Sequence, residues 1–300
     1  MADGTSACEW RPMSDVHILV SPEGGRGRAA DTSADVIDRL RSLGGHVIDL
    51  TGPDAAASAS NAREAIAGGA ERLVVLGGDG LVHLALQEVA GTDTVLGVVP
   101  VGTGNDFVRA LPGIPDDPLV AAEVALNEPD PIDAIRVGER WVASVATGGF
   151  SGDVNARANR LARPKGQSRY TVATMLELPR LRRRRTTLDI DGTRHEYDAA
   201  LLAIGNTAWF GGGMHICPDA DPDDGLLDVT VVADVGRVEL LRFFNRVFSG
   251  THLDHPKVHA HRGRRIGIDA GDLELWGDGE PVSTGATVLE AVPAAIRLAR

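Results

Sequence analysis

Residues 71–91 read ERLVVLGGDGLVHLALQEVAG: four apolar residues, an acid set among three glycines, and then a second apolar rhythm. The apolar run at 73–76 predicts a buried strand, and the apolar spacing over 81–89 predicts a helix. Glycines let the backbone turn tightly and leave N–H groups open at the positive end of that helix, where a phosphate can bind. A plain strand-to-helix turn would explain the glycines equally well, so the acid Asp79 needs its own explanation.

The alternation of strand and helix continues on both sides of this stretch. Strands are expected at 16–20, 46–50, 73–76 and 95–99, and helices at 31–43, 61–67 and 81–89. This order predicts an α/β domain with a parallel sheet covered on both faces. Three glycine-rich loops follow strands: EGGRGR (23–28), GGDG (77–80) and VGTGND (101–106). They should therefore meet at the carboxyl edge of the sheet, where ligands bind in such folds.

From about residue 134 the pattern changes to strands and tight turns, as in TTLDIDGTRHEYDAALLAIGN at 186–206. It predicts a β-rich, mostly antiparallel second domain with helical stretches near 170–178 and 237–248. The expected division is a flexible tail at 1–14, an α/β domain at 15–133 and the β-rich domain at 134–285. The boundary is placed in the proline-marked NEPDPID segment, and 286–300 are expected to return and complete the first domain.

The composition excludes several classes of protein. Thirty basic residues against 42 acidic ones give a formal charge of −12, which argues against general nucleic-acid binding. Cys8 and Cys217 form neither a disulfide framework nor a metal-ligand spacing, which indicates a reducing cytoplasm. No apolar run approaches the roughly 20 residues of a membrane span, and the polar start lacks the apolar core of a signal peptide.

The acids of the glycine loops point to a divalent cation. A carboxylate beside phosphates is repulsive unless a cation lies between them, and Mg2+ takes one or two carboxylates plus substrate phosphates. Asp79 and Asp106, each in a glycine-rich loop after a strand, are therefore interpreted as metal-directed acids. The chain lacks the lysine motif G-x-x-x-x-G-K-[ST], so it is not a P-loop enzyme.

The glycine loops belong to a longer series of motifs that resembles a known family. SPEGGRGRA, GGDGLVH, PVGTGNDF, GGFSGDV, FGGGMHICPDADPDDGLLDV and WGDGE occur in this order over roughly residues 15–295. In that order they resemble the diacylglycerol kinase catalytic family, which includes bacterial soluble lipid kinases and sphingosine kinases. The resemblance implies a nucleotide-binding α/β domain at 15–133 and a β-rich lipid-binding domain at 134–285, with the active site between them.

The resemblance implies that ATP and Mg2+ bind at the glycine loops. The nucleotide residues would be Ser21, Pro22, Gly25, Arg26, Thr51, Gly77, Gly78, Gly80, Thr103, Gly104 and Asn105. Ser21 stands where the family usually has asparagine, and its shorter side chain bears on one hydrogen bond at the adenine or ribose side.

The resemblance also implies roles for separate acids. Asp79 is likened to the general base of sphingosine kinases, whereas bacterial lipid kinases give that role, or a metal-linked one, to Asp278 and Glu280. Both assignments stay open. Asp133 matches an acid of the family's charged active-site network. Asp153 matches the position that meets the lipid head group in sphingosine kinases.

The segment DPDDGLLD at 221–228 resembles a structural Mg2+ loop of the bacterial members. Its expected ligands are Asp221, Asp224 and Leu226. The other interpretation, solvated acids in a proline-broken loop, stays open.

One position departs from the family pattern. The family usually follows GGDG, two residues later, with His or Asn and then Glu, but here His83 precedes Leu84. The contribution of that glutamate is therefore absent, or it comes from Glu88, one helical turn later.

The resulting interpretation is an ATP-dependent lipid kinase acting on diacylglycerol or a sphingoid-type lipid. One alternative is a soluble-substrate kinase such as NAD kinase, since ALNE occurs at 125–128; there it should open an apolar strand, which the following PDPID is expected to break. The other is a non-catalytic lipid- or nucleotide-binding regulator, motivated by Leu84 and Ser21.

The expected partners follow from this interpretation. They are a membrane lipid as substrate and an anionic membrane surface at the inner face of the membrane, with a homodimer as a candidate assembly. Arg180 and the run 182–185 form a basic segment near leucines, which would face such a membrane. An apolar helical stripe that includes Phe243 and Phe248 is interpreted as core or as the lining of an acyl-chain cleft.

Overall fold

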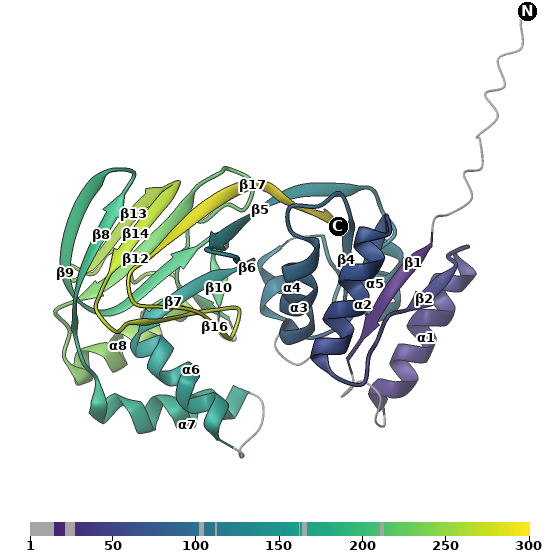
Figure 1. The fold of residues 1–300 in the computed structure, drawn as a ribbon. Helices are drawn as coiled ribbons and strands as arrows, with labels where there is room; N and C mark the ends of the chain where they lie inside the picture. Colours follow the sequence, from purple (N-terminus) through teal and green to yellow (C-terminus); the bar gives the residue numbers. More distant parts are fainter. Residues whose placement is uncertain are drawn as a thin grey trace, which may run out of the picture.

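The computed structural model describes residues 15–21, 28–101, 105–111, 113–161, 163, 167–210 and 213–300. Within these ranges the side chains of 28–31, 106, 167–168 and 244–245 are not described. The tail expected at 1–14 lies outside the described residues. The chain forms two lobes side by side, an α/β lobe and a β-rich lobe (Figure 1).

The α/β lobe has the predicted parallel sheet. Its elements are β1 (Val16–Val20), α1 (Arg28–Ser42), β2 (Val47–Asp49), α2 (Ala55–Ala67), β3 (Arg72–Gly77), α3 (Asp79–Val89), β4 (Val95–Pro100), α4 (Asp106–Ala110) and α5 (Pro118–Val124). The strands lie in the order β4-β3-β1-β2, all parallel. Side chains of α2 and α3 pack on one face, and those of α1 and α5 pack on the other.

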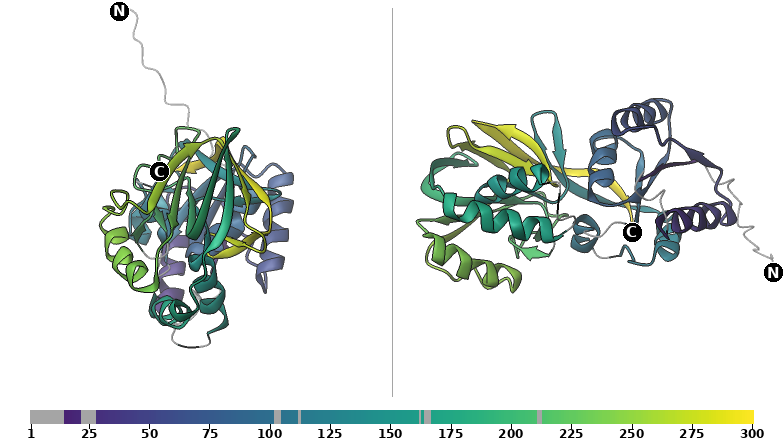
Figure 2. Two further views of the ribbon diagram at one scale, coloured as in Figure 1. Left: turned by 90° about the vertical axis from the view of Figure 1, so that its left-hand side faces the viewer. Right: turned by 90° about the horizontal axis from the view of Figure 1, so that it is seen from below.

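The β-rich lobe is mostly antiparallel, as predicted. Its strands are β5 (Pro129–Val137), β6 (Arg140–Val142), β7 (Val145–Gly149), β8 (Arg184–Ile190), β9 (Thr193–Gly205), β10 (Trp209–Phe210), β11 (Met214–His215), β12 (Leu227–Ala233), β13 (Val258–Gly263), β14 (Arg265–Asp269), β15 (Glu274–Gly277), β16 (Glu280–Thr284) and β17 (Thr287–Ala299). Its helices are α6 (Phe150–Arg160), α7 (Gln167–Glu177), the 3-10 turn η2 (Leu178–Arg180) and α8 (Arg237–Phe248). Figure 2 shows these helices gathered on one side of the lobe.

The last strand joins the two lobes. β17 pairs with β14 at its start and with β5 along most of its length, both antiparallel. Near its end Arg297 and Leu298 pair in parallel with β4. The final run therefore returns to the α/β lobe, and in the described residues fifteen strands form one continuous sheet.

Asp133 fixes the bend of this strand. Only 4% of the residue is exposed, and its carboxylate accepts the N–H groups of Gly225 (2.6 Å) and Ala294 (2.9 Å). Ala294 has φ +52°, a left-handed conformation that is costly for a residue with a Cβ. The buried acid thus holds a strained bend of β17 against the loop before β12.

The proline-marked segment at 127–133 differs from our expectation that PDPID breaks a strand. Pro129 and Pro131 lie inside β5, opposite Ala299 and Arg297 of β17. The pairing of β5 with β6 starts at Ile135, so this half of β5 is an edge. Prolines are tolerated there because no neighbouring strand needs their missing N–H.

Several helices also differ from the sequence expectation, and α4 and α5 were not predicted. α2 starts at Ala55 instead of 61, because Asp54 caps it by accepting the N–H of Ala57 (2.8 Å). α3 starts at Asp79, so the acid lies in its first turn. α6 was not predicted, because its GGFSGDV start reads as a turn-forming motif.

Replacing Asp133 with alanine should lower the free energy of unfolding by about 3 kcal/mol, because two buried N–H groups lose their acceptor. Urea denaturation of the full chain measures this change. Asp272→Ala is the control, since its side chain is 96% exposed and its loss should stay within about 0.5 kcal/mol. Equal stability of the two variants would contradict this role of Asp133.

Candidate active site

The carboxyl ends of the parallel strands meet at one edge. The N–H of Ser21, after β1, donates to Leu76 O at 2.9 Å, and the N–H of Val101, after β4, donates to Gly77 O at 3.2 Å. Thr51, after β2, accepts the N–H of Val20 at 2.9 Å. The loops that the sequence analysis assigned to a nucleotide therefore converge in their described parts.

Part of the predicted nucleotide set lies outside the described residues: Pro22, Gly25, Arg26, Thr103 and Gly104. The backbone of Asp106 starts α4, but its side chain is not described. Asn105 precedes α4 in a left-handed conformation with φ +52°.

The GGDG turn leaves the start of α3 open. A Cβ at Gly77 would lie 2.9 Å from the side chain of Leu81, so the strand end packs directly against the helix. A Cβ at Gly80 would meet nothing within 4 Å. No side chain caps the start of α3, and the N–H groups of Leu81 and Val82 donate to Gly78 O at 3.0 and 3.2 Å. The helix start is therefore open on the side of Gly80, and its positive end favours an anion.

Asp79 connects this turn to a cavity between the lobes, which we call the cleft cavity. Its Oδ1 accepts the N–H of Phe107 at 3.3 Å, which joins the loops after β3 and β4. The cleft cavity has a volume of about 110 Å³, and Asp79, His83 and Asp278 all line it. The fold thus gathers two acids that are 199 positions apart in the chain, by the difference of their residue numbers.

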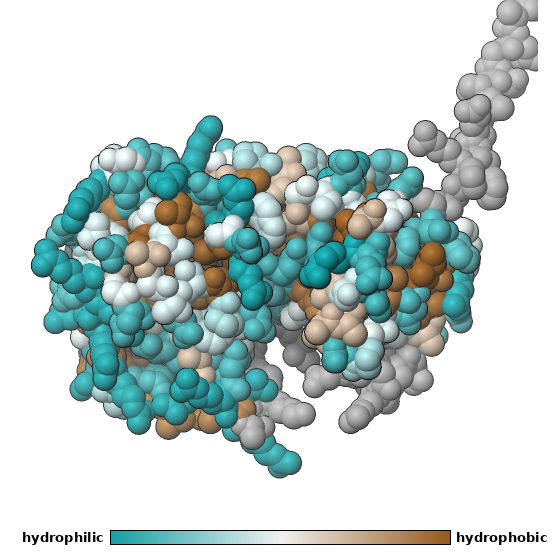
Figure 3. Space-filling model, viewed as in Figure 1, coloured by the Kyte–Doolittle hydropathy of each residue, from teal (hydrophilic) through white to brown (hydrophobic). Residues whose placement is uncertain are grey.

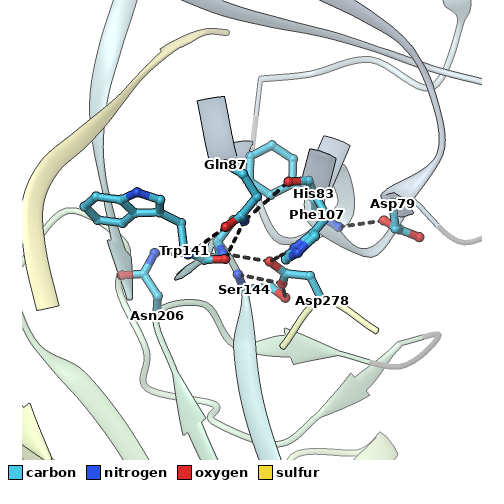
Figure 4. Close-up of polar contacts among 9 residues, drawn as sticks. Asp79, His83, Gln87, Phe107, Trp141, Ser144, Asn206 and Asp278 are labelled. Atoms are coloured by element: carbon cyan, nitrogen blue, oxygen red, sulfur yellow. Dashed lines mark hydrogen bonds and ion pairs between the residues drawn. The ribbon is translucent and has the colours of Figure 1, made fainter. Parts of the chain in front are cut away.

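Asp278 lies at the junction of the lobes (Figure 4). Its carboxylate accepts the N–H groups of Ala143 (2.8 Å) and Ser144 (3.1 Å) and the hydroxyl of Ser144. His83 Nδ1 of α3 lies 3.4 Å away. The Asp278 side chain is 10% exposed, and the backbone of this residue is left-handed, with φ +51°. With so many donors around it, this acid acts as an anchor between α3 and the start of β7.

A second contact holds α3 beside β6. Gln87 Oε1 accepts the N–H of Trp141 at 3.0 Å, and its Nε2 donates to Trp141 O at 2.8 Å (Figure 4). Glu88 instead pairs with Arg63 of α2 at 2.7 Å. Glu88 does not line the cleft cavity and is thus no substitute for the glutamate replaced by Leu84. No motif in the sequence marks Gln87 as a contact between the lobes.

Three predicted acids lie away from the cleft cavity. Glu280 is exposed at the start of β16, and Asp133 is used in the β17 bend. Asp153 lies on α6 with its carboxylate 3.4 Å from Arg184. Asn155, two residues later, lines the cleft cavity, although the sequence analysis did not single it out.

The predicted Mg2+ loop is held by hydrogen bonds and arginines. Asp221 accepts the N–H of Asp223 (3.1 Å), and Asp224 accepts that of Leu226 (2.9 Å). Arg262 lies 2.8 Å from Asp224, and an arginine at the chain end lies 3.0 Å from Asp223. These cations compensate Asp223 and Asp224, and the assignment of Asp221, Asp224 and Leu226 to Mg2+ stays a prediction.

The described residues contain no cluster of three or more His, Cys, Asp or Glu side chains suited to a metal. Mg2+ on a nucleotide needs fewer protein ligands, and Asp79 beside the open start of α3 fits that requirement. Burial raises the pKa of the Cys217 thiol to about 12, so this cysteine is no thiolate nucleophile.

A second, apolar cavity of about 310 Å³ adjoins the cleft cavity. Its walls come mainly from apolar side chains of α6, α7, α8, β9 and the β10–β11 pair, among them Val154, Met175, Leu201, Met214 and Phe248. Asn155, Tyr170 and Phe210 line both cavities. A ligand with a polar end and an apolar chain could therefore occupy the two together.

Asp278→Asn should lower the free energy of unfolding by about 2 kcal/mol, because an amide nitrogen cannot accept from the N–H groups that the carboxylate now binds. Chemical denaturation measures the difference. Glu280→Gln is the matched control and should leave stability unchanged, since Glu280 is exposed. If both variants lost the same stability, Asp278 would not be the anchor described here.

Comparison with family models and with known proteins shows to which family this chain belongs. Residues 15–137 match the family model described as "Diacylglycerol kinase catalytic domain", and residues 143–300 match "YegS C-terminal NAD kinase beta sandwich-like domain". The chain is 38% identical over 296 residues to "Diacylglycerol kinase" of Mycobacterium tuberculosis strain H37Rv, covering 96% of each chain. It is 31% identical over 242 residues to "Probable lipid kinase YegS-like" of Pseudomonas putida, covering 78% of this chain and 79% of the relative.

Solved structures agree on the fold. A crystal structure of a diacylglycerol kinase from Bacillus anthracis superposes with a TM-score of 0.75 at 20% identity, over 95% of this chain and 96% of that one. None of the helices in the described part of this chain is long and apolar enough to cross a membrane. Motif order, fold and relatives agree, and the chain belongs to the diacylglycerol kinase family.

Proposed function

We propose that this chain is an ATP-dependent lipid kinase that phosphorylates the free hydroxyl of a diacylglycerol at the cleft between its lobes. One observation carries the proposal: a cavity that contains Asp79 and adjoins the open start of α3 continues into an apolar cavity. A lipid hydroxyl could then meet a nucleotide while its chains stay out of water. The family relationship and the names of the relatives support the same activity.

The nucleotide would bind along the carboxyl edge of β1, β3 and β4. The open space beside Gly80 and the positive end of α3, which no side chain caps, suit its terminal phosphates. Mg2+ on those phosphates would neutralise their charge, with Asp79 as its protein carboxylate. The apolar cavity favours a lipid over a soluble acceptor such as NAD.

The reaction needs positioning and an acceptor for one proton. The lipid oxygen forms a bond to the γ-phosphorus, the bond from that phosphorus to the β-γ bridging oxygen breaks, and ADP leaves. A carboxylate takes the hydroxyl proton. We assign this role to Asp79, which lines the cleft cavity beside the open start of α3, whereas Ala143 and Ser144 hold Asp278 at the junction of the lobes.

Asp79→Asn should lower kcat by at least about 100-fold, because both general-base catalysis and charge neutralisation need a carboxylate at this position. The assay follows labelled phosphate from ATP into the lipid extract and, in parallel, into NAD. Asp93→Asn, on an exposed loop before β4, should keep wild-type activity. Transfer into NAD, or into neither acceptor, by the wild-type chain would refute the proposal.

The lipid would come from an anionic membrane that contacts α7 and α8. Exposed apolar side chains gather on these helices: Val172, Met175 and Leu176 on α7, and Val238, Leu241 and Phe248 on α8. Met175 is 70% exposed and also lines the apolar cavity. Figure 3 shows hydrophobic residues among hydrophilic ones along the lower edge of the β-rich lobe.

The charge of this face suits an anionic surface in an otherwise acidic chain. Arg242 and Arg246 of α8 are exposed and make no ion pair with other described residues. In the basic segment that the sequence analysis assigned to the membrane, Arg183, Arg184 and Arg185 instead pair with acids. We therefore centre the proposed membrane contact on α7 and α8. Each arginine near an anionic surface should contribute about 1 kcal/mol to the free energy of binding.

A Leu176→Glu/Val238→Glu variant should bind phosphatidylglycerol-containing vesicles at least about 10-fold more weakly, since two apolar contacts become repulsive charges. Cosedimentation measures the binding. Val120→Glu is the control, because this exposed apolar residue lies on α5 of the other lobe. Unchanged binding of the double variant would exclude this face.

A further inference from the structure

Asn155 lies where the cleft cavity opens into the apolar cavity. It lines both, with Tyr170 and Phe210 as its neighbours at this neck. The residue is half-buried and makes no hydrogen bond with the described part of the chain. A polar side chain so placed has its donor and acceptor available to whatever passes between the two cavities.

The geometry of α6 explains why Asn155, and not Asp153, is presented there. Residues three and four apart share one face of a helix. Gly152 lies against Trp276 of β15, and Asn159 donates to Gly279 O at 3.5 Å, so the face that contains Asn155 looks toward the cleft. Asp153 lies about 200° around the helix from Asn155, at 100° per residue, and pairs with Arg184.

The three side chains that line the neck, Asn155, Tyr170 and Phe210, carry no charge. The carboxylate of Asp153 is paired with Arg184, and that of Asp278 accepts the N–H groups of Ala143 and Ser144 on the cleft side. The amide of Asn155 offers one carbonyl acceptor and two N–H donors without charge. A glyceride matches this set with ester carbonyls and a hydroxyl, whereas none of the neck side chains gives an ammonium group a counter-charge.

We propose that Asn155 binds the head group of the lipid acceptor and makes the site select a neutral glyceride over a cationic sphingoid base. This specificity rests on the proposed lipid kinase function. An aspartate at position 155 would supply the counter-charge that the ammonium group needs, and it would remove the two donors that the ester carbonyls use.

The test measures kcat/KM for a short-chain diacylglycerol and for sphingosine in the same detergent micelles. In the Asn155→Asp variant the ratio of the two values should fall by at least about 10-fold in favour of sphingosine. The Asn127→Asp variant is the control, since it makes the same chemical change at an exposed residue that lines neither cavity, and it should keep the wild-type ratio. A thermal denaturation scan confirms that each variant is folded.

Asn155→Ala keeps the test decisive if the aspartate variant does not fold. It should raise KM for the diacylglycerol about 10-fold with a smaller change in kcat, and calorimetry without nucleotide should show weaker binding of the same lipid. A wild-type ratio in Asn155→Asp, or a wild-type KM in Asn155→Ala, would overturn the role of Asn155. Failure of the wild-type chain to phosphorylate any lipid would instead refute the proposed function.

Discussion

The carboxylate of Asp278 is the constraint on which the arrangement of the cleft depends. It lies in a turn with left-handed backbone and accepts hydrogen bonds from the chain between β6 and β7, while His83 of α3 approaches it from the other lobe. A buried carboxylate is stable only with such donors around it. Because α3 also carries Asp79, this contact and that of Gln87 with Trp141 fix where the GGDG turn stands relative to the β-rich lobe.

The acids of this chain fall into two physical groups. Asp153, Asp223 and Asp224 face arginines, and Asp133 is enclosed by backbone donors, so their charges are used to hold the structure. Asp79 accepts the N–H of Phe107 and also lines a cavity beside an open helix start. A sequence motif shows that an acid is present but not which partner it meets, and the partner decides whether it can act on a substrate.

Polarity changes steadily across the proposed site. The GGDG turn leads into the start of α3, which no side chain caps, and the cleft cavity holds acids and Ser144. Asn155 marks the passage to apolar walls on α6, α7 and α8. This order matches a reaction between a charged nucleotide and a lipid. It also places the exposed apolar side chains of α7 and α8 beside the apolar end, where a bilayer would deliver the substrate.

The order of the motifs indicated the family. The sequence alone also determined the parallel α/β lobe and the antiparallel second lobe, because apolar periodicity and glycine turns are local properties. It did not identify α6, since its start reads as a turn, nor the strand at Pro129, which is tolerated only because that part of β5 is an edge. Tertiary structure decided the rest. Whether Asp153 or Asn155 reaches the cleft depends on how α6 is rotated against Trp276 and Arg184, and such contacts between residues far apart in the chain leave no local pattern.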